Sequence, residues 1–135
     1  MVTYIDISEK RKGIISKINM TPEFFVFALR KELVNESLNQ YKDIYKTPID
    51  EVTDLFYKES LTLYNTLNGN QRDVLFSIKR QVIVDTISSL LAVIDGVSML
   101  SVQEEVLELR EKNGEIINGE LQDIFLIQEE NDTNS

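Results

Sequence analysis

The chain has 135 residues, of which 42% are hydrophobic, so it is long and apolar enough to bury one core, and we expect a single domain spanning residues 1–135. It contains no cysteine and no histidine. Disulfides, thiolate metal sites, Ser-His and Cys-His catalysis, and haem ligation by either residue are therefore excluded.

The N-terminal sequence predicts no export signal, and no segment predicts a membrane span. Asp6 and Glu9 lie where a signal peptide would carry basic residues before an apolar run. The most apolar stretch, 82–100, contains Asp85 and Asp95, each of which would be costly in lipid. We therefore interpret this stretch as a buried core helix and, given the absence of cysteine, expect a cytoplasmic protein.

The net charge of −9 is concentrated near the C-terminus. Residues 1–20 carry four basic and two acidic side chains, whereas residues 101–135 carry two basic and ten acidic ones. Such a surface repels phosphate backbones and anionic lipids, so we expect neither nucleic acid nor membrane as a partner. A basic protein is the partner that these charges favour; the alternative is that they only keep the protein soluble. The predicted acidic interaction surface consists of Glu108, Glu111, Glu115, Glu120 and Asp123.

For residues 1–20 the sequence leaves a helix and irregular structure open. Ser8 can cap a helix there, but Gly13 within it costs about 1 kcal/mol relative to alanine. The segment Thr21-Pro22-Glu23 then predicts a helix start, because Thr can cap free N–H groups and Pro suits the first helical position. We expect this helix to continue to about Lys46. Its predicted buried face consists of Phe27, Val34, Leu38, Tyr41 and Tyr45.

The segment Thr47-Pro48-Ile49-Asp50 repeats this start signal and predicts a second helix from about Pro48 to Leu67. Asn68-Gly69 ends the helix, because Gly tolerates the left-handed conformation that a helix terminus often needs. The predicted buried stripe of this helix consists of Ile49, Val52, Phe56, Leu63 and Leu67.

Asn70 can cap a third helix over about 71–95, which Asp95-Gly96 ends. After Ile83 this helix is apolar in nearly every direction, which predicts neighbours on all sides and a central place in the fold. We therefore expect a mainly α fold, a helical bundle around this helix. Its one polar or small stripe consists of Gln81, Asp85, Ser88, Ala92 and Asp95, at spacings of four, three, four and three residues.

The pattern changes after Val106. Leu107 and Leu109 alternate with charged residues, and Asn113-Gly114 supplies two residues suited to a type I′ turn, so we expect a short β-hairpin. The acidic tail, 129–135, is expected to be frayed. Between the two, Asn118 can cap a final helix whose apolar residues are Leu121, Ile124 and Phe125.

No motif points to a cofactor, a metal or a catalytic group. The sequence has no Walker loop, no Gly-rich dinucleotide turn and no EF-hand loop. Asp50, Glu51 and Asp54 suit the start of a helix, where the dipole favours acidic residues, so we do not interpret them as a metal site. We expect a non-enzymatic protein without a cofactor.

The polar stripe of the third helix is the predicted binding site, because a carboxylate on so apolar a helix must find polar partners. It could line a small pocket or an interface. The alternative is that Asp85 is satisfied by Arg80, Lys79 or a hydroxyl from another helix, or faces the solvent through a gap in the packing. Ser88 and Ala92 also allow another helix to approach closely, including one from a second copy of the protein. The predicted binding residues are Gln81, Asp85, Ser88 and Asp95.

Three runs in the second half of the chain resemble a family of short, uncharacterised bacterial proteins. They are RQVIVDT at 80–86, DGVS at 95–98 and NGELQDIFL at 118–126. The family has no established activity, so the resemblance implies no catalytic or binding residue. It implies that Asp85 and the segment after the predicted hairpin belong to a recurring structural plan.

These observations favour a non-enzymatic interaction module whose acidic C-terminal surface binds a basic protein partner. Toxin neutralisation, an immunity or antitoxin-like role, is one concrete version. Two alternatives stay open: a small-molecule sensor or unusual enzyme that uses Asp85 in a helical pocket, and a structural homo-oligomer. The sequence identifies neither the partner nor the biological process.

Overall fold

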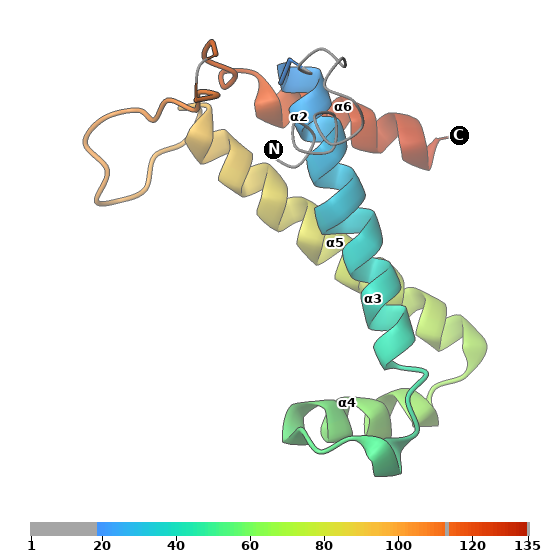
Figure 1. The fold of residues 1–135 in the computed structure, drawn as a ribbon. Coiled ribbons are helices and arrows are strands. Elements are labelled where there is room, and N and C mark those ends of the chain that lie inside the picture. The colour runs from blue at the N-terminus through green and yellow to red at the C-terminus, as the bar shows by residue number, and fades with distance from the viewer. Residues whose placement is uncertain (1–18, 113, 135) are drawn as a thin grey trace, which may run out of the picture. The chain divides into compact units, whose positions relative to one another are not determined.

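The computed structural model describes residues 19–112 and 114–134 (Figure 1). Of these residues 67% are helical, which confirms the mainly α fold class. The N-terminal helix considered for residues 1–18 lies outside the described residues. The described residues form two compact units: the first unit contains 19–27 and 90–134, and the second unit contains 28–89. That the whole chain is a single domain stays a prediction.

One continuous helical run begins at the predicted Thr21-Pro22 signal. It consists of α2 (Pro22–Leu29), the π-helix η1 (Arg30–Glu36) and α3 (Ser37–Ile44). The Oγ1 atom of Thr21 accepts a hydrogen bond of 3.1 Å from the backbone N–H of Phe24, which confirms the expected cap. The end of the run is also close to the predicted one.

The π-helical segment explains why the predicted buried face is wrong at one residue. Phe27 is 55% exposed, whereas Val26 is fully buried. A π turn contains more residues than an α turn, so it shifts the side chains that follow by about one position. Val34 is therefore in phase with Val26 rather than with Phe27. The rest of the face is confirmed, since Val34, Leu38 and Tyr45 are buried and Tyr41 is half-buried.

The second predicted helix, Pro48 to Leu67, is wrong in its first third. A single 3-10 turn, η2 (Ile49–Glu51), is followed by extended backbone, and helix α4 spans only Leu55–Thr66. Asp54 caps α4, because its carboxylate accepts a hydrogen bond of 3.1 Å from the backbone N–H of Tyr57. The helix therefore begins at the cap formed by Asp54 and not at the predicted Thr47-Pro48 signal upstream.

The predicted buried stripe of this helix is wrong at Ile49, Phe56 and Leu63, which are exposed, whereas Val52 and Leu67 are half-buried. Phe56 and Leu63 are 63% and 61% exposed, whereas Leu61 is fully buried. Tyr57 and Tyr64 are half-buried, so the inward side of α4 follows positions 57, 61 and 64. Aromatic residues outside the predicted stripe therefore set which side of the helix faces the core.

Three aromatic rings lie together in the second unit. The ring of Tyr64 in α4 stacks on the ring of Tyr45, just after α3, with 4.7 Å between their centroids. The ring of Phe76 meets both edge-on at 6.0 Å. Since Phe76 belongs to α5 (Gly69–Ile94), this cluster joins three helical segments.

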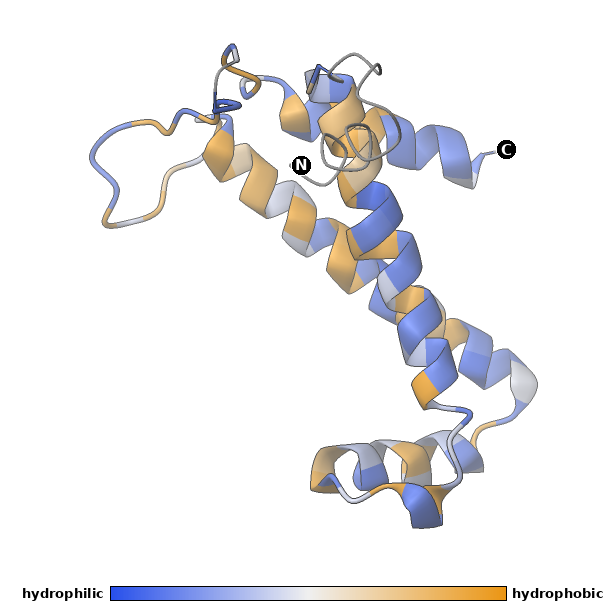
Figure 2. Ribbon diagram, in the orientation of Figure 1, coloured by the Kyte–Doolittle hydropathy of each residue, from blue (hydrophilic) through white to orange (hydrophobic). Residues whose placement is uncertain are grey.

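Helix α5 confirms the predicted third helix to within two residues at each end. Its cap is Asn68 rather than the predicted Asn70, because Asn68 and Gln71 exchange two hydrogen bonds of 2.9 Å. Hydrophobic residues dominate its C-terminal half (Figure 2). Leu90 is nevertheless 57% exposed, so the expectation of neighbours on every side is wrong there. The buried residues are Val84, Ile87, Leu91 and Ala92.

The predicted β-hairpin after α5 is wrong. The described residues of 97–120 contain no strand, only an isolated antiparallel bridge between Arg110 and Ile116. Ile117 adds one backbone hydrogen bond of 2.9 Å, from its N–H to the carbonyl of Leu109. Asn113 of the predicted turn lies outside the described residues.

The side chain of Asn118 forms hydrogen bonds with backbone groups that would pair with the opposite strand in a longer β-ladder. Its carbonyl oxygen accepts from the N–H of Leu109 at 2.8 Å, and its Nδ2 donates to the carbonyl of Leu107 at 3.0 Å. The same Nδ2 donates to the carbonyl of Ile94 at 2.6 Å, which ties this segment to the end of α5. A side chain thus replaces the strand pairing that the alternating pattern predicted.

Helix α6 (Leu121–Thr133) confirms the predicted final helix, and its Leu121 and Phe125 are fully buried. It contacts α2 through Gln128, whose Nε2 donates to the carbonyl of Glu23 at 3.2 Å. The helix continues past Glu129, where we expected fraying. Among the residues that the structure describes, no helix combines the length and hydrophobicity that a membrane span requires.

Candidate functional site

The predicted polar stripe is divided between two different roles. In the second unit, Nε2 of Gln81 donates a hydrogen bond of 2.8 Å to Oδ1 of Asp85, and both side chains are exposed. Asp85 is therefore satisfied at the surface and requires no ligand to compensate for burial. Ser88 is half-buried in the same helix, α5.

Asp95 has a structural role in the first unit. Its Oδ1 accepts from the backbone N–H of Gly119 at 2.7 Å, and its Oδ2 accepts from that of Gln122 at 2.8 Å. Gln122 is the second residue of α6, so the carboxylate caps this helix and faces the positive end of its dipole. The flanking Glu120 makes no such bond with its own side chain. Asp95 is thus an N-cap supplied from 27 residues away.

Sequence reasoning missed this cap, although a signal for it was present. Asp95-Gly96 and Asn118-Gly119 are two Asx-Gly pairs, and both glycines adopt positive φ angles of 79° and 133°. Such backbone geometry favours glycine and directs the chain sharply away from a helix end. Two such pairs flank the segment that connects α5 with α6, and their Asx side chains bond to the opposite end of that segment.

The acidic C-terminal part contains a cavity of about 390 Å³. Two of the predicted acidic residues, Glu111 and Glu115, line it, and Glu115 is exposed. The remaining wall combines polar and apolar residues, and sequence reasoning did not anticipate the part of it that comes from residues 19–22, at the start of α2. Its other lining residues are Asn19, Met20, Thr21, Pro22, Gly114, Ile116 and Ile117.

The other residues of the predicted acidic surface lie outside this cavity. Glu108 pairs with Arg110 at 2.6 Å, and Arg110 also donates to the carbonyl of Gly114 at 3.4 Å. Glu120 and Asp123 are exposed at the start of α6. Of the predicted acidic surface, the cavity therefore includes Glu111 and Glu115, and Glu108 lies outside it.

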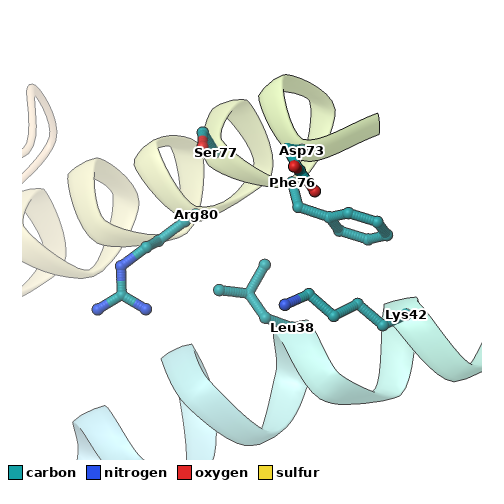
Figure 3. A pocket seen from close by; sticks show the side chains of 6 residues that line it. All are labelled: Leu38, Lys42, Asp73, Phe76, Ser77 and Arg80. Atoms are coloured by element: carbon teal, nitrogen blue, oxygen red, sulfur yellow. The ribbon is translucent and has the colours of Figure 1, made fainter. Parts of the chain in front are cut away.

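A second, smaller cavity of about 230 Å³ lies in the second unit, between α3 and α5 (Figure 3). Lys42 of α3 and Arg80 of α5 extend into the space between the helices (Figure 3). The ammonium of Lys42 lies 5.5 Å from the ring centroid of Phe76, and the guanidinium of Arg80 donates to Oδ1 of Asn35 at 3.1 Å. The cationic groups of Lys42 and Arg80 therefore already form contacts between α5 and the helical run of η1 and α3. The lining residues are Leu38, Lys42, Asp73, Phe76, Ser77 and Arg80.

Neither cavity is lined by histidine or cysteine, because the sequence contains neither residue. Within 19–112 and 114–134, no three acidic side chains are grouped so as to hold a metal ion. No protein-family model matches the chain, and no curated protein or solved structure matches it. The resemblance of 80–86, 95–98 and 118–126 to short bacterial proteins stays a prediction.

Proposed function

We propose that this protein is a non-enzymatic interaction module whose first unit binds a basic protein partner through the cavity lined by Glu111 and Glu115. An immunity or antitoxin-like role, in which the partner is a basic toxin, is one concrete form. The observation that carries the proposal is the combination of two carboxylates with an apolar wall in one cavity of the most acidic part of the chain.

The charge of the first unit supports the proposal. Segments 1–27 and 90–135 of the sequence carry fourteen acidic and six basic side chains, a net charge of −8, whereas segment 28–89 carries nine acidic and eight basic ones, a net charge of −1. A field of this sign attracts a basic surface from a distance and raises its association rate. It also disfavours nucleic acid and anionic membranes as partners.

The composition of the cavity supports a lysine or arginine side chain as its occupant. Such a side chain has an aliphatic stem that packs on apolar surface and a cationic head that needs carboxylates. Pro22 and Ile116 offer the apolar surface, and Glu111 and Glu115 offer the carboxylates. A cation inserted there would lose part of its water and gain charge-assisted hydrogen bonds.

The alternative function, a small-molecule sensor or unusual enzyme that uses Asp85, has weaker support. Asp85 is exposed and already accepts a hydrogen bond from Gln81, and neither residue lines one of the two cavities described above. A ligand bound only by the folded protein would raise its thermal stability. Small metabolites that stabilise the wild type but not Asp85→Asn would favour this alternative.

The test is a pull-down with tagged protein at low and high ionic strength, followed by mass spectrometry. We expect a basic protein at low salt that is lost at high salt, because screening weakens exposed charge pairs. The variant Glu111→Gln/Glu115→Gln should lose it, whereas Glu104→Gln/Glu105→Gln, which removes the same charge from an exposed loop of the first unit, should retain it. A partner that both variants retain equally, or no basic partner at all, contradicts the proposal.

A further inference from the structure

The cavity between α3 and α5 in the second unit is lined by opposite charges that do not pair with each other. Asp73 of α5 and Lys42 of α3 both line it, and both side chains are exposed. Among the residues that the structure describes, neither forms an ion pair, whereas the nearby side chains of Asp43 and Lys46 lie 3.6 Å apart. The cavity therefore presents a carboxylate and an ammonium that each lack a charged partner in the described part of the chain.

Positive and negative groups lie toward opposite ends of this cavity. Arg80 also lines it and follows Asp73 by two helical turns of α5, about 10 Å along the helix axis. Figure 3 shows the side chain of Lys42 extending from α3 in the direction of Arg80. The guanidinium of Arg80 is oriented by its hydrogen bond of 3.1 Å to Oδ1 of Asn35. Lys42 and Arg80 therefore form a positive end of the cavity, and Asp73 forms a negative end.

The rest of the wall suits a small ligand with an apolar part. Leu38 is buried on α3, and the half-buried ring of Phe76 lies on α5. Ser77 adds a hydroxyl group, which can both donate and accept a hydrogen bond. The volume of about 230 Å³ is below that of cavities that hold drug-sized ligands. An occupant must therefore be small, with charged groups attached to an apolar body.

We propose that this cavity binds a small zwitterion, a free amino acid with an apolar side chain. In this arrangement the ammonium of the ligand pairs with Asp73 and its carboxylate pairs with Lys42. Arg80 adds positive charge beside the carboxylate, and the apolar side chain packs on Leu38 and Phe76. The inference is independent of the proposed function, because this cavity belongs to the second unit and the acidic cavity to the first.

The mixed charge of the wall selects a zwitterion over a singly charged ligand. An anion such as inorganic phosphate would meet the carboxylate of Asp73, and a simple amine would meet Lys42 and Arg80; like charges disfavour both. A zwitterion instead brings an opposite charge to each end, and charge-assisted hydrogen bonds are the strong ones. The contact of Lys42 with the ring of Phe76, at 5.5 Å, is compatible with this, because an ammonium carries three N–H donors.

Titration of the full chain with L-leucine, followed by NMR at the ring protons of Phe76, tests the class of ligand. We expect saturable shifts with leucine. N-acetyl-leucine lacks the ammonium and leucinamide lacks the carboxylate, so each should bind at least about tenfold more weakly. The signal at Phe76 reports on the second unit, whereas a cation held by Glu111 and Glu115 lies in the first. No shift with leucine, or equal affinity for the three compounds, overturns the proposal.

Substitutions test the residues assigned to the two ends of the ligand. Asp73→Asn and Lys42→Met should each weaken leucine binding at least about tenfold, and Asp73→Asn should also lose the preference for leucine over N-acetyl-leucine. The matched controls are Asp43→Asn and Lys46→Met, which remove the same charges from an exposed ion pair outside the cavity and should bind like wild type. Equal losses in cavity and control variants, or an Asp73→Asn variant that keeps the preference, overturn the proposal.

Discussion

The two units of the chain use their charged residues in opposite ways. In the second unit, cations lie over aromatic rings, as Arg72 does over Tyr64, and the net charge is −1. The segments of the first unit, 1–27 and 90–135, carry fourteen acidic and six basic side chains. Near-neutral charge suits an apolar contact, whereas a concentrated negative charge suits a basic partner.

The units also differ in what holds their chain segments together. The second unit relies on packed rings and helix caps from neighbouring residues, such as Asn68 with Gln71. The first unit relies on side chains that bond to backbone more than 20 residues away, as Asp95 and Asn118 do. Its connecting loops are therefore held by a few specific polar bonds rather than by a β-ladder.

We expect the largest loss of stability from substitutions in the buried core of each unit. Phe125→Ala in the first unit should lower the free energy of unfolding by about 4 kcal/mol, and Leu61→Ala in the second by about 3 kcal/mol, because both side chains are fully buried. Urea unfolding followed by circular dichroism measures both. If the chain is one cooperative domain, each variant shifts the same single transition; a separate transition shifted by only one variant would contradict that prediction.

The next largest loss of stability should follow from removing the cap that Asp95 provides for α6. Asp95→Ala should lower the free energy of unfolding by about 2 kcal/mol, since two backbone N–H groups at the start of α6 lose their acceptor. Asp95→Asn should recover part of this loss, because its amide oxygen can still accept one bond. Thermal and urea denaturation of the three proteins give the comparison, and an Asp95→Ala variant as stable as wild type would refute the capping role.

A smaller effect should come from the cations over the rings of the second unit. Lys79→Met keeps the aliphatic stem but removes the charge above Tyr41, and we expect a loss of about 0.5 kcal/mol. Lys58→Met, at an exposed position of α4, is the matched control and should leave stability nearly unchanged. Equal losses in the two variants would show that the charge of Lys79 is not used for packing.

The smallest effect should follow from Asp85→Asn. Its side chain is exposed and its one described bond, to Gln81, is a surface interaction, so stability should change by less than about 0.5 kcal/mol. A large loss of stability would show that Asp85 is needed within the fold.

Sequence patterns predicted the elements whose signals are local. Thr21-Pro22 marked the start of the first helical run, and the bounds of α5 followed from periodicity and Asp95-Gly96. The π segment was not predictable from spacing, so the buried face shifted from Phe27 to Val26. At α4, the cap at Asp54 prevailed over an equally good signal upstream. Local signals of similar strength compete, and only the packed structure decides between them.

The features that depend on distant residues were the ones missed. Leu107 and Leu109 alternate as in a strand, but Asn118 binds their backbone and replaces the ladder. Asp95 was interpreted as part of a binding stripe because only its own helix was considered, whereas its partners lie 24 and 27 residues away. Similarly, Glu111 and Glu115 were predicted as acidic surface, but part of the cavity beside them comes from residues 19–22, at the start of α2.

The most direct test of the central claim is a calorimetric titration of the wild-type protein with a lysine- and arginine-rich peptide at two ionic strengths. We predict binding that weakens at high salt and falls at least about tenfold in Glu111→Gln/Glu115→Gln, since a charge-assisted bond contributes roughly 1.5–3 kcal/mol. Glu104→Gln/Glu105→Gln should bind nearly as well as wild type. Equal losses in the two variants, or no binding at low salt, would contradict the claim that this cavity receives a basic side chain.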